Sequence, residues 1–123
     1  MKVAFVLHAH SGYGELHYDL MLSVGEALAT WQLPASPVVL AKGGEMPARR
    51  LVDHRSAYLE YEGPVSRGRG RVQRIDGGEY ELVSQGPLRW EIVFSGSDLA
   101  GRWELVRPDE GTDAWTLRRL GPA

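Results

Sequence analysis

The sequence of 123 residues contains no cysteine, and this absence excludes several kinds of site. A disulfide scaffold, a zinc site with thiolate ligands and a thiol nucleophile all require that residue. Any metal ion must therefore be held by His, Asp or Glu side chains. A chain of this length buries about two-thirds of its unfolded surface, so we expect a single domain over residues 1–123 that needs no cross-links.

Long hydrophobic runs and a large excess of one charge are also missing. The apolar start of the chain ends at His8, which is too early for a signal peptide, and no later stretch approaches the ~20 apolar residues of a membrane span. The net charge is −2, which argues against nonspecific coating of nucleic acid but leaves room for a local basic patch. We therefore expect a cytoplasmic protein without membrane contact.

Helix signals are scarce, whereas 15 glycines and 7 prolines separate short runs rich in Val, Leu, Tyr and Trp. Several links have the length of a hairpin turn, so neighbouring strands are expected to pair antiparallel and to hide their edges by closing. We predict an all-β, mainly antiparallel fold, a small closed or nearly closed β-barrel of about eight strands, with the four tryptophans in its core. The predicted strands are Lys2–His8, Leu16–Val24, Ala27–Leu33, Arg69–Ile75, Glu79–Ser84, Leu88–Phe94, Gly101–Arg107 and Ala114–Arg119.

The segment 34–63 departs from this pattern because prolines and glycines crowd its first half. Behind Asp53, a residue suited to a helix N-cap, the chain through Leu59 favours one short helix. We interpret the segment as an insert that covers a barrel mouth or carries function. A further turn is predicted at residues 76–78, between two of the predicted strands.

Three of the four histidines lie close together in the sequence, beside an aspartate. In the second predicted strand the two-residue period sends His17, Asp19 and Met21 to one face, and it places His8 and His10 on one face of the first strand. Imidazole and carboxylate groups at this spacing can share one metal ion. A lone histidine is more often a hydrogen-bonded structural residue, but the clustering favours a metal-binding or catalytic role. His8 is either a ligand or a supporting donor.

A second pair, His54 and Tyr58, lies four residues apart in the predicted short helix. An imidazole and a phenol at this spacing project from the same side of a helix. They are candidates for acid–base or hydrogen-bonding chemistry.

The basic run over residues 67–74 is a third feature. If the strand begins that early, Arg67, Arg69 and Arg71 share one face, and the glycines between them let a ligand approach the backbone. Guanidinium groups suit phosphate. The alternative is a solvated edge strand whose charges block aggregation, and the excess of arginine over lysine along the whole chain weakens the signal.

Several short motifs, taken in order, resemble the 3′-phosphoesterase domain of bacterial ATP-dependent DNA ligase D. The most specific are His-x-Asp at 17–19 and Asp-His-x-x-x-Tyr at 53–58. The others lie at 31–34, 61–63, 76–81 and 99–107, so the resemblance covers nearly the whole chain. It implies a stand-alone, divergent member of the family. Such a domain is a small β-barrel that binds a divalent metal, preferably manganese with zinc possible, and removes 3′-terminal ribonucleotides and 3′-phosphates in DNA repair.

The resemblance also implies roles for individual residues and partners. His17 and Asp19 match the metal-binding His-x-Asp, and His10 matches the upstream ligand histidine. His54 and Tyr58 match the second His and Tyr of the family. The implied partners are nucleic-acid 3′ ends and ligase or polymerase proteins.

The departures from the family pattern concern spacing and the phosphate contacts. The interval from His10 to His17 is one residue longer than in the family, which leaves His8 as a rival ligand, and the loop after residue 63 is shorter. Met21 and Ala35 stand where the family has a phosphate-binding Arg and a Lys. Arg69 and Arg71 are then candidates to replace that clamp.

Three functions remain open on the sequence alone. The first is a metal-dependent phosphoesterase that acts on nucleic-acid 3′ ends. The second is a catalytically weak or inactive module of the same fold that binds metal and nucleic acid, which the missing clamp favours. The third, read without the family, is a non-haem iron oxygenase, because two histidines and an aspartate also form its facial triad.

Overall fold

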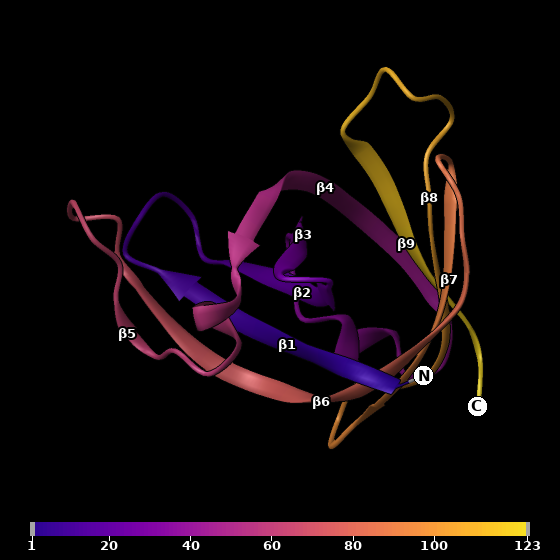
Figure 1. The fold of residues 1–123 in the computed structure, drawn as a ribbon, viewed down its shortest axis with the longest axis horizontal. Coiled ribbons are helices and arrows are strands. Elements are labelled where there is room, and N and C mark those ends of the chain that lie inside the picture. Colours follow the sequence, from indigo (N-terminus) through magenta and orange to yellow (C-terminus); the bar gives the residue numbers. More distant parts are fainter. Residues whose placement is uncertain (1, 123) are drawn as a thin grey trace.

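The computed structural model of the protein describes residues 2–122, which form a single antiparallel sheet (Figure 1). Its strands are β1 (Lys2–Ser11), β2 (His17–Val24), β3 (Ala27–Leu33), β4 (Gly44–Arg55), β5 (Gly63–Pro64), β6 (Arg71–Gln85), β7 (Arg89–Gly96), β8 (Ala100–Val106) and β9 (Ala114–Gly121). Two 3-10 turns, η1 (Pro37–Leu40) and η2 (Ser56–Leu59), flank β4. Within these described residues no helix is long and apolar enough to cross a membrane.

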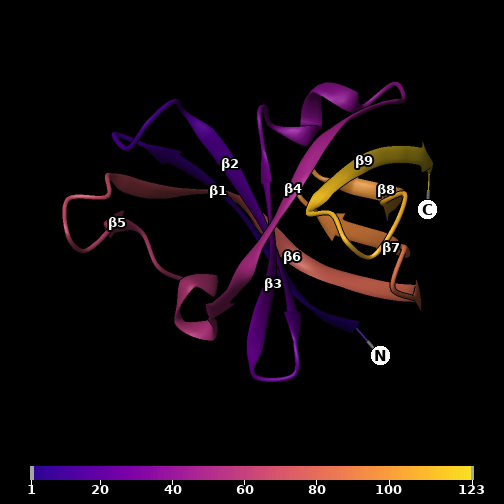
Figure 2. The same ribbon diagram turned by 90° about the horizontal axis from the view of Figure 1, so that it is seen from above.

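The sheet closes on itself. Its strand order is β1-β2-β3-β4-β9-β8-β7-β6-β5, and β1 also pairs with β6 along ten residues of its length. Eight strands therefore form a closed antiparallel barrel, and the short β5 attaches to the start of β6 (Figure 2). The prediction of a small all-β barrel of about eight strands is confirmed.

The interior of the barrel is a single apolar cluster to which all eight barrel strands contribute. Because side chains alternate across a strand, the inward-facing set includes Phe5 and Leu7 on β1 and Leu20 and Leu22 on β2. All four tryptophans are buried, as predicted. The ring of Trp31 lies edge-on to two of the others, with centroids 5.0 and 5.7 Å away.

The turn predicted at 76–78 is wrong, because β6 runs unbroken through these residues. The two predicted strands around them are one long strand, which pairs with β5 and β1 along its first part and with β7 from Gly78 onward (Figure 1). The glycines serve close packing instead of a turn. A Cβ at Gly78 would lie 2.7 Å from the carbonyl oxygen of Ser95 on β7.

The interpretation of 34–63 as an insert is also wrong, because this segment supplies the barrel strand β4. Pro47 is tolerated there because β3 pairs with β4 only from Arg49 onward, which leaves one side of residue 47 without a neighbouring strand. The predicted short helix is reduced to the turn η2. Asp53 lies in β4 and pairs with Arg50 at 3.1 Å instead of capping a helix.

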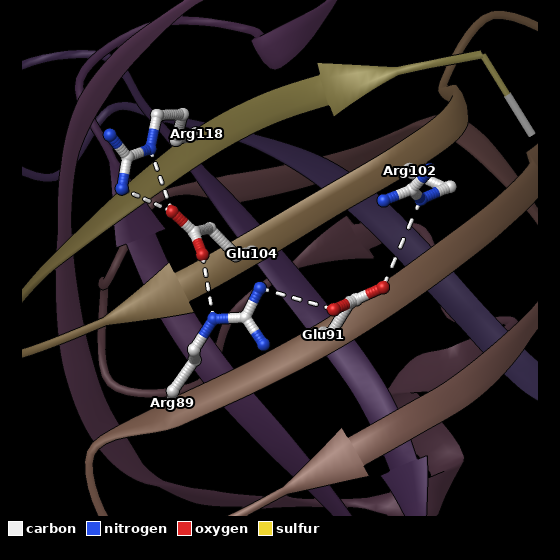
Figure 3. A network of polar contacts seen from close by, with 5 residues as sticks. All are labelled: Arg89, Glu91, Arg102, Glu104 and Arg118. Carbon is white, nitrogen blue, oxygen red and sulfur yellow. Dashed lines mark hydrogen bonds and ion pairs between the residues drawn. The ribbon is translucent and has the colours of Figure 1, made fainter.

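Charged residues cover the outer face of β7, β8 and β9 (Figure 3). Glu104 accepts hydrogen bonds from Arg89 and Arg118, each at 2.7 Å, and is itself buried beneath them. Glu91 joins the network through Arg89 at 3.1 Å and lies 3.8 Å from Arg102. This half of the barrel is therefore held by cross-strand ion pairs outside and by aromatic packing inside.

Candidate metal centre

The histidines and the aspartate lie on the outer face of β1 and β2, opposite the barrel core. Three directly paired positions share this face and run from apolar to polar: Val6 with Met21, His8 with Asp19, and His10 with His17. Residues directly opposite one another on antiparallel strands point the same way. The histidines and Asp19 therefore share one face of the sheet, as the two-residue period predicts.

Three of these side chains converge on one point. His10, His17 and Asp19 each offer a ligand atom, and these atoms lie within 4.8 Å of one another. Nδ1 of His10 lies 3.7 Å from Oδ2 of Asp19, and Nε2 of His17 lies 3.8 Å from Oδ1. Two imidazoles and one carboxylate form a donor set that suits a divalent transition metal and leaves coordination positions open.

The second nitrogen of each imidazole is held by a backbone carbonyl. Nε2–H of His10 donates to the carbonyl oxygen of Arg69 at 2.6 Å, and Nδ1–H of His17 donates to that of Glu15 at 3.1 Å. Because a carbonyl only accepts, the proton resides on the nitrogen that points away from Asp19. The nitrogens that face Asp19 therefore carry free lone pairs, as metal ligation requires.

Asp19 is buried and incompletely satisfied. Its Oδ1 atom has no hydrogen-bond partner anywhere in residues 2–122. Burial raises the pKa of the Asp19 carboxyl, while the neighbouring imidazoles of His17 and His10 act to lower it. A cation among these three side chains would satisfy the unpaired oxygen, so the residues present fit a metal ion.

His8 pairs directly with Asp19, one cross-strand pair away from His10 and His17, and it is not among the three side chains that converge. It is 1% exposed, and burial lowers its pKa to about 4, so it is neutral at pH 7. The longer interval between His10 and His17 is absorbed by the turn between β1 and β2, and the two residues remain directly paired. The structure therefore brings His10 into the ligand cluster and places His8 beside it.

His54 and Tyr58 face the same site from β4 and η2. Their ring centroids are 5.8 Å apart, although they do not share a helix as predicted. Nδ1–H of His54 donates to the carbonyl of Val52 at 3.0 Å, which leaves Nε2 free. Both residues line a cavity of about 140 Å³ together with His8, His10 and Asp19.

Met21 forms the floor of this cavity and is 1% exposed. It packs with Val6 and Leu28 in a small cluster, which Tyr58 and Leu59 cover from η2. This packing fixes η2 against the barrel wall. It also leaves no charged group at the position where the resemblance implies a phosphate-binding arginine.

The arginines of the basic run do not share a strand face. Arg67 lies in a turn with φ of 63°, and Arg69 precedes β6. Arg69 lines the cavity, but its guanidinium is hydrogen-bonded to Ser66 at 2.9 and 3.1 Å. Arg71 points to the opposite face of β6 from Val72, which pairs with His10, so the structure does not bring it into the site.

Two other arginines flank the site: Arg74, which belongs to the basic run predicted from the sequence, and Arg49, which sequence reasoning did not place there. One row crosses five strands on the outer face: Arg74, His8, Asp19, Gln32 and Arg49. Arg49 also lines a groove of about 580 Å³ with His17 and Gln32. Only the two-residue alternation along β4 indicates that Arg49 faces outward. That alternation can be used only once residues 44–55 are known to form a strand.

Two comparisons with known proteins show what this chain is similar to. A family model described as the DNA Ligase D 3′-phosphoesterase domain matches residues 7–107. The multifunctional non-homologous end joining protein LigD of Pseudomonas aeruginosa is 30% identical over 102 residues. That match covers 75% of this chain and 12% of the relative, so the chain spans a small part of the relative's length. The family match includes the three clustered residues, His54 and Tyr58.

Proposed function

Because the chain belongs to the DNA ligase D 3′-phosphoesterase domain family, we propose that it is a divalent-metal-dependent phosphoesterase acting in DNA repair. Its substrates in this proposal are nucleic-acid 3′ ends, from which it removes 3′-terminal ribonucleotides and 3′-phosphates. Ligase or polymerase proteins are the proposed partners. The observation that carries the proposal is the convergence of His10, His17 and Asp19 beside an unpaired, buried carboxylate oxygen.

In this proposal Nδ1 of His10, Nε2 of His17 and the carboxylate of Asp19 hold the ion. A divalent cation bound there supplies charge stabilisation at a phosphate oxygen and lowers the pKa of bound water. Manganese is the proposed metal. Zinc binds imidazole nitrogen more tightly and can replace it in a purified sample.

The chain's own groups supply the remaining steps. In this proposal His54 acts as an imidazolium: its Nδ1–H stays bonded to the carbonyl oxygen of Val52, and its Nε2–H donates the proton that the leaving oxygen receives as the P–O bond breaks. The Tyr58 hydroxyl, beside His54 in the lining of the cavity, donates a hydrogen bond to a phosphate oxygen. His8 remains neutral because of its burial and adds no competing positive charge.

The test separates metal binding from turnover. His17→Ala and Asp19→Ala should each abolish stoichiometric manganese or zinc binding, measured by calorimetry and metal analysis. His54→Ala should retain the metal and lose about 10²–10⁴-fold in the rate of 3′-phosphate release from an oligonucleotide. Unchanged metal binding in both of the first two variants would contradict the proposed centre.

A binding module of the same fold is the second candidate, and the burial of Met21 at the clamp position favours it. The same measurements distinguish the two. A wild-type chain that binds metal and 3′ ends but releases no phosphate or nucleoside is the module. Measurable turnover that His54→Ala removes identifies the phosphoesterase.

A further inference from the structure

A second cavity, of about 360 Å³, adjoins the metal-centre cavity behind η2. Its walls come from η2 and from the loop around β5, and they include Arg55, Tyr58, Tyr61 and Val65. Tyr58 and Val65 line both cavities, so these two side chains form the partition between them. A group bound in the second cavity would therefore lie next to a phosphate bound at His54 and Tyr58.

Two tyrosine rings give this cavity flat apolar walls. The centroids of Tyr58 and Tyr61 are 5.6 Å apart, and their planes meet at 81°. A planar ligand that stacks on one ring consequently presents its edge to the other, and both arrangements are favourable for aromatic groups. The size of the cavity is at the lower end of small-molecule pockets, which span about 300–1,000 Å³.

The position of Tyr61 is fixed by its own loop. Its hydroxyl donates a hydrogen bond to the carbonyl oxygen of Pro64, and Gly63 packs against the ring. Gly63 has φ of 128°, and a Cβ there would lie 3.4 Å from the Tyr61 hydroxyl oxygen. The wall is thus formed before any ligand binds, which lowers the entropic cost of binding.

A positive charge stands at the rim. Arg55 is exposed, lines the cavity and takes part in no ion pair with any residue from 2 to 122. The cavity therefore combines two stacking surfaces, one cation and a neighbouring centre suited to phosphate. That combination matches the parts of a nucleotide better than those of a purely apolar ligand.

We propose that this cavity binds the base of the terminal nucleoside whose 3′ phosphate lies at the metal centre. The base stacks against Tyr61 and Tyr58, and the Arg55 guanidinium contacts the phosphate on the 5′ side. This inference rests on the proposed function, because that function defines the phosphate as the neighbour. It adds a recognition site that makes the protein prefer a nucleoside phosphate to a bare phosphate ester.

Binding of adenosine, which carries no phosphate, tests the cavity without any turnover. In the metal-free chain, adenosine should shift the backbone amide NMR signals of Ala57, Val65 and Ser66. Tyr61→Ala should weaken this binding about 5- to 150-fold, the range for one stacked base. Tyr61→Phe retains the ring but loses the hydrogen bond to Pro64, so it should bind adenosine more weakly than wild type and more tightly than Tyr61→Ala.

Tyr13→Ala is the matched control, because Tyr13 is an exposed tyrosine that stacks near His10 outside this cavity. It should leave adenosine binding unchanged. Adenosine shifts that appear elsewhere, or equal binding by wild type and Tyr61→Ala, would overturn the assignment whether or not the protein hydrolyses phosphoesters.

A second measurement links the cavity to the phosphate. With manganese bound, 3′-AMP should bind more tightly than inorganic phosphate, and Tyr61→Ala should remove that advantage. Arg55→Gln should weaken a 5′-extended dinucleotide more than 3′-AMP, with Arg102→Gln on the far face as its control. If only metal binding fails, the proposed function is overturned. If the metal-bound protein binds 3′-AMP no more tightly than inorganic phosphate, the assignment of this cavity as a base site is overturned.

Discussion

Arg49 and Met21 show how one side chain changes the phosphate contacts available around the metal centre. Met21 is packed beneath Tyr58 and Leu59, so a longer charged residue there would have to be buried in an apolar cluster. Arg49 instead stands exposed on the same outer face, beside Gln32 and the groove next to His17. In the proposed function, the positive charge that contacts the nucleic acid comes from Arg49 on β4, which is separated from the strand of Met21 by β3.

This inference predicts a specific loss of affinity. Arg49→Gln should weaken binding of a single-stranded 3′ end and reduce the slope of log affinity against log salt by about 0.7, the contribution of one phosphate contact. Arg71→Gln makes the same change on the opposite face of β6 and should leave the slope unchanged. The affinities are measured by filter binding or fluorescence titration. Equal effects from the two variants would show that the affinity depends on the net charge of the protein and not on a contact made by Arg49.

At the scale of elements, the loop that leads into β6 supports the candidate metal centre through its backbone. Gly70 has φ of 80° and packs against the end of β1, where a Cβ would lie 2.0 Å from the carbonyl oxygen of Ser11. The preceding carbonyl, that of Arg69, accepts the hydrogen bond from His10. The geometry of a ligand histidine therefore depends on a glycine in another element.

Gly70→Ala should displace this carbonyl and lower metal affinity about 10- to 100-fold, the usual effect of losing a partner behind a ligand histidine. Gly68→Ala is the control, because Gly68 has φ of 66° and open space where the Cβ would lie. Both variants have the same left-handed strain of about 1–2 kcal/mol. Calorimetric titration of manganese should separate them, and equal affinities would show that the Arg69 carbonyl does not matter.

The elements also show what could be read from the sequence. The bounds of β3 agree with the predicted Ala27–Leu33, and the period of two placed His17 and Asp19 on the correct face. Proline and glycine misled the prediction at β4 and β6, because their turn propensity is local and their tolerance depends on which strand lies alongside. Arg49 reaches the site only through the pairing of β3 with β4, a contact no local pattern contains.

At the scale of the whole molecule, Asp76 connects β6 to the turn between β7 and β8. From β6 its carboxylate accepts hydrogen bonds from three consecutive backbone N–H groups in the turn between β7 and β8, at 3.1, 3.0 and 2.7 Å. Burial acts to raise the pKa of Asp76, but the backbone donors, led by Leu99, outweigh it and hold the pKa below its ordinary value.

The sign of the pH effect follows from this lowered pKa. The stability that Asp76 contributes is fully present above its unfolded-state pKa of 3.8 and is lost as the pH falls through the lower folded-state value. At pH 7, Asp76→Asn should lower the free energy of unfolding by about 1–3 kcal/mol. In urea titrations of the metal-free chain, the difference from wild type should shrink below pH 4.

Asp109→Asn provides the comparison, because Asp109 is exposed and its carboxylate accepts one backbone hydrogen bond, from the N–H of Gly111. It should change the free energy of unfolding by less than about 0.5 kcal/mol, as is usual for surface sites. A difference between wild type and Asp76→Asn that stays constant down to pH 2 would assign the loss to packing instead of charge.

The position of the metal centre on the outside of a closed barrel has a consequence for access. A site inside a barrel admits only molecules narrow enough to enter along its axis. Here the interior is filled by the core, and the ligand cluster faces outward from β1 and β2. The cavity of about 140 Å³ limits only the group that reaches the three clustered side chains. In the proposed function, the rest of the nucleic-acid strand extends along the barrel wall, so the site selects the chemistry of the strand's end and not its length.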